Sequence, residues 1–313
     1  MGIKMGMCGT GAFADCFIPL FKAHPDVDSV VLCDLDAEKL KEKCKKFEIT
    51  ESYPSLDALC ESDVDAIAVI TQHHLHGPHA VQALKAGKHV YSAVPSAVSM
   101  EEITELVKTV EETGQIYMIG ETSYYYPCTL FCRDKFQKGE FGQIVYSEGE
   151  YIHDYLHGCI DIAKWRLGDE WQQKFGIPPM FYPTHSTSMV VSVTGAHATH
   201  VCGMGIEDNR EYKLPPKDEA EKEYREYNFY AREDNYWKNP FSNETILCKM
   251  SDGSVMRINE FRRAGHTGTC GMSMIGTDGS YEQQTGPTGE GYSTKAAIWL
   301  NKNLDDRLDV SPL

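Results

Sequence analysis

The first third of the chain alternates short apolar runs with amphipathic stretches. The apolar runs read IKMGMC, SVVLCD, DAIAVIT, KHVYSAV and QIYMI. Between the second and third runs, residues 36–47 place Leu40, Cys44 and Phe47 on one side of a helix. Regular alternation of strand and helix patterns is typical of parallel strands joined by crossover helices. The sequence therefore predicts an α/β fold that begins with a Rossmann dinucleotide-binding domain over about residues 1–122.

One helix in this region has a clear beginning and end in the sequence. Ser99 suits the N-cap, Glu102 follows three residues later, and Gly114 suits the position just past the last turn. After about residue 143 the pattern changes to strand-like runs that flank Asp-Gly pairs at 252–253 and 278–279. Asp-Gly between apolar runs is typical of β-hairpins. We therefore expect a second domain over residues 123–313.

Composition narrows the class of protein. The chain has 313 residues, of which 42% are hydrophobic and 11% aromatic, enough to build two cores. Its net charge of −16 comes without a basic stripe, so no nucleic-acid partner is expected. No apolar run approaches the ~18 residues that span a bilayer, and no signal-peptide pattern opens the chain, so no membrane partner is expected. Eleven cysteines without a CxxC pair favour reduced thiols and a cytoplasmic location.

The segment after the first predicted strand carries a dinucleotide-binding fingerprint. In CGTGAFA, Gly9 and Gly11 occupy the first two glycine positions and Ala14 the third. Asp34 ends the second strand, where a carboxylate accepts hydrogen bonds from ribose hydroxyls and repels a 2′-phosphate. The alternatives are a glycine turn without a ligand, and Asp34 as a helix N-cap. We expect NAD rather than NADP, with cofactor contacts from Gly9, Thr10, Gly11, Ala12, Phe13 and Asp34.

A longer stretch after the fourth predicted strand resembles a known family. Residues 69–97 read VITQHHLHGPHAVQALKAGKHVYSAVPSA, which resembles the Gfo/Idh/MocA family of sugar-active oxidoreductases. The matching positions are Thr71, His76, Ala83, Leu84 and 87–90. The resemblance implies a C-terminal α/β domain with an open, mostly antiparallel sheet, which binds substrate and takes part in oligomerisation. It also implies cofactor contacts from Thr71, His73, His76, Val94 and Pro95.

One tripeptide departs from the pattern of that family. Most members have Glu-Lys-Pro where this chain has Ala93, Val94 and Pro95. The family lysine sits beside the substrate hydroxyl and assists proton removal during hydride transfer. Valine cannot accept or relay a proton, so the acid/base chemistry must lie elsewhere or be absent.

Two short motifs are similar to those of a hydrolytic branch, the NAD-dependent α-N-acetylgalactosaminidases. Residues 151–154 read YIHD and residues 182–185 read YPTH. The branch uses the tyrosine and histidine of each motif for catalysis, which implies Tyr151, His153, Tyr182 and His185 here. After His185 the chain reads STSM, whereas Gly-Leu-Gly-Pro is typical of the branch, and this departure leaves the sugar open.

Local structure rules place these four side chains in suitable positions. Side chains alternate along a strand, so Tyr151 and His153 should share one face. Pro183 suits the start of a helix that continues to Gly195, and His185 would then lie in its first turn. The helix dipole there disfavours the imidazolium, which supports a neutral base.

The resemblance implies redox-assisted glycoside cleavage. Hydride leaves C3 of the sugar for NAD, the C2 proton becomes acidic, the C1 substituent leaves, and water adds before the hydride returns. The alternatives are a simple NAD-dependent sugar or polyol dehydrogenase and a non-catalytic NAD-sensing regulator. We expect a small-molecule sugar or glycoside substrate and a homo-oligomer. We expect no metal, because the histidines at 73, 74, 76 and 79 lack accompanying cysteine or carboxylate ligands.

Overall fold

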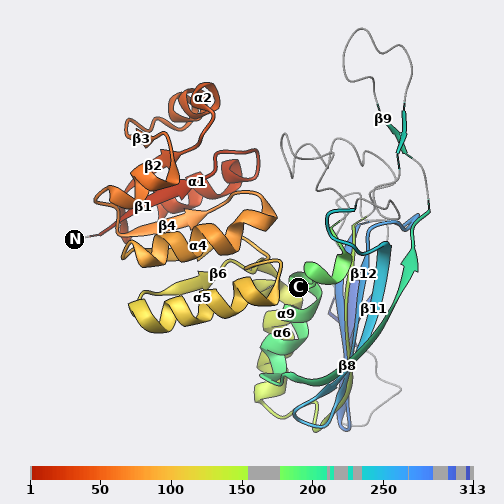
Figure 1. Ribbon diagram of the computed structural model, residues 1–313. Helices are drawn as coiled ribbons and strands as arrows, with labels where there is room; N and C mark the ends of the chain where they lie inside the picture. Colours follow the sequence, from red (N-terminus) through yellow and green to blue (C-terminus); the bar gives the residue numbers. More distant parts are fainter. Residues whose placement is uncertain are drawn as a thin grey trace. The chain divides into compact units, whose positions relative to one another are not determined.

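A computed structural model describes most of the chain, and Figure 1 shows it as a ribbon. The described residues are 2–153, 177–209, 212–214, 225–227, 235–266, 268–284, 295–300 and 308–310. The chain divides into two compact units, one over Met1–Gly120 and the other beginning at Glu121. Each unit is built on its own sheet.

The first unit is built on a six-stranded parallel sheet. Its strands run in the order β3-β2-β1-β4-β5-β6, and every neighbouring pair is parallel. The strands are β1 (Ile3–Cys8), β2 (Val27–Cys33), β3 (Ser52–Tyr53), β4 (Ala66–Val69), β5 (His89–Ser92) and β6 (Tyr117–Ile119). This is the strand order of a dinucleotide-binding fold, in which the order reverses between β1 and β4.

Helices of this unit flank the sheet, and the one between Ser99 and Gly114 has the ends that its sequence predicts. They are α1 (Ala14–Ala23), α2 (Ala37–Phe47), α3 (Leu56–Glu61), α4 (His76–Lys85) and α5 (Met100–Thr113), with a 3₁₀ turn η1 (His73–Leu75). The Ser99 hydroxyl accepts a hydrogen bond from the Glu102 N–H, and Gly114 ends α5 in the left-handed region at φ 66°. Figure 1 shows α4 and α5 side by side against the sheet.

Both faces of the parallel sheet are covered by core. On one face Val31, Ile67 and Val69 pack with helix residues such as Leu84 and Leu106. On the other face Leu32, Ala66 and Ala68 pack with Ile18 and Leu40, among others. A strand that is buried on both faces needs a continuous apolar run rather than an alternating one. This explains why the strand sequences of the first unit are almost wholly apolar.

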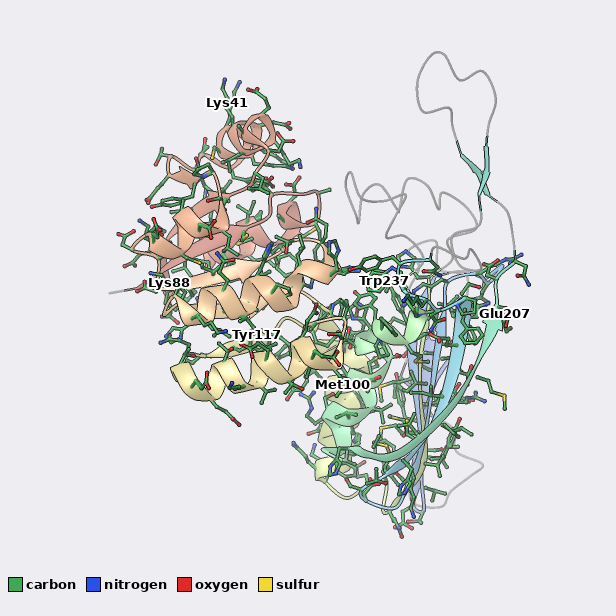
Figure 2. All side chains as sticks on the ribbon, in the orientation of Figure 1. Lys41, Lys88, Met100, Tyr117, Glu207 and Trp237 are labelled. Atoms are coloured by element: carbon green, nitrogen blue, oxygen red, sulfur yellow. The ribbon has the colours of Figure 1, made fainter. Side chains whose placement is uncertain are left out.

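The second unit is built on an eight-stranded sheet that is mostly antiparallel. Its order is β16-β15-β14-β13-β7-β12-β11-β8, and only the pair of β7 with β12 is parallel among the described strands of this sheet. The strands are β7 (Ile144–Ile152), β8 (Ala198–Glu207), β11 (Phe241–Met250), β12 (Val255–Phe261), β13 (Thr269–Gly276), β14 (Gly279–Gln284), β15 (Lys295–Leu300) and β16 (Leu308–Asp309). A separate two-stranded ribbon joins β9 (Tyr212–Leu214) to β10 (Arg225–Tyr227). Figure 2 labels Glu207 on β8 and Trp237 ahead of β11.

Helices of the second unit cover one face of this sheet, as Figure 1 shows. They are α6 (Pro127–Gln137) and α9 (Thr184–Thr194), with 3₁₀ turns η2 (Thr122–Tyr125) and η4 (Pro179–Phe181). The backbone of α9 comes so close to β7 that a Cβ at Gly149 would collide with the Ser186 carbonyl. A glycine is therefore required at that point of β7, and it lets the N-terminal part of α9 pack against the strand that contains Tyr151.

The predicted fold class is confirmed, and most predicted elements are present. The five apolar runs form β1, β2, β4, β5 and β6, and both Asp-Gly pairs lie at hairpin turns, β11–β12 and β13–β14. The two-residue strand β3 was not predicted, because it is too short to carry a pattern. Among the described helices, none combines the length and the apolar character that crossing a membrane requires.

Candidate active site

The predicted cofactor contacts gather at one edge of the first sheet. Residues 9–13 follow β1, Asp34 follows β2, residues 71–76 follow β4, and residues 94–95 follow β5. These four strands are neighbours in the sheet, and all are parallel, so their carboxyl ends meet at the same edge. Ligands of open α/β sheets bind at this edge, where the strand order reverses.

The two glycines of the fingerprint have different local roles. Gly9 has φ 94°, and a Cβ there would lie 2.5 Å from the Ile70 carbonyl oxygen, so the fold itself requires glycine. A Cβ at Gly11 would meet nothing within 4 Å. The N–H groups of Gly11, Ala12 and Phe13 donate no hydrogen bond within the described part of the chain. Open space beside three available N–H donors at the start of α1 fits the pyrophosphate of a dinucleotide.

Asp34 holds the glycine loop in place. Its Oδ2 accepts hydrogen bonds from the Thr10 N–H at 2.8 Å and from the Thr10 hydroxyl at 2.7 Å. Its Oδ1 accepts the Asp36 N–H at 3.0 Å. The N-cap of α2 is Asp36, whose carboxylate accepts the Lys39 N–H, so the alternative interpretation of Asp34 as that cap is wrong.

His76 ties together the two loops that follow β4 and β5. Its Nδ1 lies 2.8 Å from the Pro95 carbonyl oxygen and its Nε2 lies 3.0 Å from the Thr71 carbonyl oxygen. The ring is 1% exposed, and burial lowers the pKa of His76 despite those two carbonyls. The ring of His73 packs edge-on against it, and Val94 is buried beside Pro95. His76 therefore positions the loops, while Thr71 and His73 are only partly buried.

The four predicted catalytic side chains form two hydrogen-bonded pairs in the second unit. The Tyr151 hydroxyl lies 2.8 Å from His153 Nδ1, and the Tyr182 hydroxyl lies 3.0 Å from His185 Nε2. The pairs are packed together, because the Tyr151 ring centroid is 5.2 Å from that of His185 and 6.4 Å from that of Tyr182. The structure thus brings together two motifs that lie about thirty residues apart in the sequence. Asp154, the last residue of the first motif, lies outside the described residues.

The local structure explains this arrangement. Tyr151 belongs to β7, and the contact with His153 places both side chains on the same face, as strand alternation predicts. The helix α9 begins at Thr184, so His185 is in its first turn, and the helix ends at Gly195 with φ 70°. The expected helix and its bounds are therefore confirmed.

Glu121 is a member of the site that the sequence did not reveal. Its Oε1 lies 2.6 Å from His185 Nδ1 and accepts the Ser123 N–H at 2.8 Å. The Ser123 hydroxyl donates in turn to the His185 carbonyl at 2.9 Å. Burial favours the protonated acid, but the contacts with His185 and Ser123 outweigh it and hold the pKa of Glu121 below its usual value. Because a carboxylate only accepts, the His185 proton lies on Nδ1, and Nε2 presents a lone pair to Tyr182.

A buried ion pair also reaches the site. Glu260 is 0% exposed and Arg262 is 3% exposed, and Arg262 Nη2 lies 2.7 Å from Glu260 Oε2. Burial raises the pKa of Glu260 to about 7, against the opposing effects of Arg262 and of the Ser186 hydroxyl, which donates to Glu260 Oε1. The sequence pattern of β12 could have indicated that Glu260 is buried. Glu260 continues the series of inward-facing positions that holds Met256 and Ile258.

The described residues contain no group of three or more histidine, cysteine, aspartate or glutamate side chains that could hold a metal ion. Among the histidines that follow β4, His79 Nδ1 lies 3.2 Å from the Thr71 hydroxyl, and His76 contacts backbone carbonyls. These two rings are therefore engaged in holding the loop.

Residues 3–121 match the oxidoreductase family with an NAD-binding Rossmann fold, GFO_IDH_MocA. This match covers the first unit and confirms the resemblance expected from residues 69–97. The same family description confirms NAD as the predicted cofactor.

Two relatives from Bacteroides fragilis extend the similarity into the second unit. Glycosyl hydrolase family 109 protein 2 of strain YCH46 is 33% identical over 208 residues, which cover 62% of this chain and 49% of the relative. An alpha-N-acetylgalactosaminidase from strain NCTC 9343 matches with the same identity and the same coverage. This chain therefore spans about half the length of these curated relatives. The predicted resemblance to a glycoside hydrolase branch is confirmed.

A solved structure shows the same fold. Scyllo-inositol dehydrogenase from Lactobacillus casei, crystallised with NAD(H) and scyllo-inositol, is similar with a TM-score of 0.68 and 16% identity. The match covers 90% of this chain and 75% of that chain. At this identity the similarity establishes the two-domain fold.

Proposed function

We propose that this protein cleaves glycosides by a redox-assisted route that begins with hydride transfer from C3 of the sugar to NAD. The observation that carries the proposal is the pair of tyrosine–histidine hydrogen bonds, at 2.8 and 3.0 Å, within one packed cluster. The route needs neutral proton carriers near C2, C3 and the leaving oxygen, and these two pairs supply them. The relative named alpha-N-acetylgalactosaminidase supports this choice of reaction class.

Glu121, His185 and Tyr182 form a proton relay in this proposal. Glu121 fixes the His185 proton on Nδ1, so the Nε2 lone pair accepts the Tyr182 hydroxyl proton. When Tyr182 takes a proton from the substrate, its own proton passes to His185 Nε2, and Glu121 stabilises the resulting imidazolium. His185 thus acts on the C3 hydroxyl through Tyr182 in place of the absent lysine.

Tyr151 and His153 form the second proton carrier. Their hydroxyl and Nδ1 atoms lie 2.8 Å apart, close enough to share one proton. This pair transfers protons at C2 and at the leaving oxygen. The sequence and geometry leave open which of the four groups removes the C2 proton. Bound NAD supplies the hydride acceptor and later the hydride donor. Gly11, Ala12 and Phe13 would bind its pyrophosphate through their N–H groups, and Asp34 its ribose.

The first test separates this proposal from its two rivals. The protein is incubated with NAD⁺ and a panel of glycosides that begins with an aryl α-N-acetylgalactosaminide, alongside the free sugars. Release of the aryl group with no net accumulation of NADH supports the proposal. NADH formed in stoichiometric amounts from a free sugar would identify a simple dehydrogenase instead. No turnover, together with NAD-dependent capture of a partner protein, would identify a regulatory sensor.

We propose further that residues 1–122 bind the cofactor and that residues 123–313 bind the substrate and form a homo-oligomer in the cytoplasm. Exposed apolar side chains on β8 support the oligomer, because Val201, Met204 and Ile206 are 60%, 86% and 66% exposed. Light scattering during size-exclusion chromatography tests it. A monomeric mass at micromolar concentration would contradict the homo-oligomer.

A further inference from the structure

The ion pair of Glu260 and Arg262 lies against both catalytic motifs. The guanidinium carbon of Arg262 is 4.8 Å from the Tyr151 ring centroid and 6.0 Å from that of Tyr182. On the other side of the pair, Glu260 accepts a hydrogen bond from the hydroxyl of Ser186, which follows His185 in α9. One ion pair therefore touches β7, the end of η4 and the first turn of α9.

Burial makes this pair a costly feature to keep. Two charges lose their hydration when they are buried, and the attraction between them seldom does more than offset that cost. Apolar residues of similar size would fill the same space at no such cost. The neighbours Met256 and Ile258 show that β12 otherwise presents apolar side chains to this face. A role beyond packing is therefore expected of Glu260 and Arg262.

Ser186 links the pair to the departure from the family pattern. The resemblance gives glycine at the position after the catalytic histidine, and glycine has no hydroxyl to donate. Here Ser186 is 0% exposed, and its hydroxyl contacts Glu260 and the Pro183 carbonyl. This departure from the family pattern therefore lies against the buried ion pair.

We propose that Arg262, held by Glu260 and Ser186, is a positioning residue that orients Tyr151 and Tyr182 and makes their phenols more acidic. This inference rests on the proposed function and deepens it. A cation about 5 Å from a phenol stabilises the phenolate, so each tyrosine releases its proton more readily. Glu260 reduces that effect and fixes the cation over the two rings. Among the described residues, the titratable groups near the two phenols include His153, His185, Glu121, Glu260 and Cys270, together with Arg262 itself.

A matched control lies on β12, the strand that Arg262 follows directly. Arg257 contacts Glu148 through its Nε at 3.0 Å, on the opposite face of the sheet, and it is 44% exposed. Arg257→Met removes the same charge from a position five residues earlier, without touching the tyrosines. It therefore controls for general effects of losing an arginine from this part of the chain.

The experiment uses tyrosine labelled with ¹³C at the hydroxyl-bearing ring carbon and follows its NMR titration in the full chain. Tyr151→Phe and Tyr182→Phe assign the two signals. Arg262→Met should move both midpoints to higher pH by about one unit, whereas Arg262→Lys and Arg257→Met should leave them near the wild-type values. Glu260→Gln should move them to lower pH, because the cation then has no counter-charge.

Midpoints that do not move in folded Arg262→Met, or that move equally in Arg257→Met, would overturn the inference. If Arg262→Met fails to fold, the sign of the shift in Glu260→Gln decides the question, and an upward shift or no shift would overturn the inference. The titration needs no turnover, so its result stays distinct from failure of the proposed reaction. With an active substrate, the rising limb of kcat/KM against pH should shift in the same direction as the phenol midpoints.

Discussion

The loops proposed to bind NAD in the first unit and the tyrosine–histidine cluster of the second unit are held together by different kinds of contact. In the first unit, side chains contact mainly backbone groups. The Asp34 carboxylate accepts hydrogen bonds from the Thr10 N–H and hydroxyl, and the His76 ring contacts two backbone carbonyls. In the second, side chains contact side chains, as when Glu121 meets His185 and His185 meets Tyr182. Substitutions in the first unit should therefore change the affinity for NAD, and substitutions in the tyrosine–histidine cluster should change kcat.

The largest effect is expected from the proposed proton carriers. Tyr182→Phe and His185→Ala should each lower kcat by ~10²–10⁴-fold, because each removes a proposed general acid/base group. NAD affinity should stay at the wild-type value in both variants. Tyr146→Phe is the matched control, since its hydroxyl contacts Glu148 and not the site. An equal loss of kcat in the control and in the two variants would contradict a specific role for Tyr182 and His185.

The next largest effect is on the pH dependence of the free energy of unfolding, and Glu260 is its source. Its pKa is raised from 4.5 to about 7, so between those values the folded protein holds a proton that the unfolded chain has released. Stability should therefore fall as pH rises from about 4.5 to 7, by an amount on the order of 3 kcal/mol. Glu260→Gln should flatten that dependence in urea unfolding at a series of pH values. An equal slope in wild type and variant would contradict the raised pKa.

Glu121 affects the pH dependence of stability in the opposite direction to Glu260, because its pKa is lowered and not raised. Its folded pKa lies below the ordinary value of 4.5, so its contribution to stability is present above that pH and is lost as pH falls.

In catalysis, Glu121→Gln should lower kcat by ~10²-fold, because the orientation and proton position of His185 are no longer fixed. Steady-state kinetics against a glycoside test this effect. A fall in NAD affinity without a fall in kcat would place Glu121 outside the relay.

The smallest effect separates the two glycines of the first unit. Gly11→Ala should leave the melting temperature unchanged and weaken NAD binding about tenfold, since its Cβ would enter the open space proposed for the pyrophosphate. Gly9→Ala should destabilise the fold by ~1–3 kcal/mol, because φ is 94° and Ile70 blocks the Cβ. Calorimetry of unfolding and of NAD binding measures both. The reverse order of effects would contradict the assignment.

The same contrast explains what the sequence could and could not predict. The strands, the bounds of α5 and α9, and the positions of the glycines follow from local patterns, because caps and turns depend on neighbouring residues. Tyr151 and His185 could be proposed because each sits in a recognisable four-residue motif. Glu121 and Arg262 could not, because their contacts with the motif residues are distant in the sequence. Glu121 contacts His185, which lies 64 residues on, and the Arg262 guanidinium lies near the rings of Tyr151 and Tyr182.

The alternation of β12 was the one usable sign of a buried charge. Met256, Ile258 and Glu260 occupy successive inward-facing positions, and a carboxylate in an apolar series indicates a paired group. The pattern does not name the partner. Arg262 lies two residues on and pairs with Glu260, but the contacts of the guanidinium with Tyr151 and Tyr182 depend on the tertiary fold.

The central claim, oxidation at C3 before cleavage at C1, is tested most directly by isotope exchange at C2. A glycoside that the protein turns over is cleaved in D₂O, and the released sugar is examined by NMR. Oxidation at C3 before cleavage should place deuterium at C2, and the reaction should be slower when the substrate carries deuterium there, since the C2 proton must leave and be replaced. A cleaved glycoside with no label at C2 and no rate effect from the C2-deuterated substrate would contradict it.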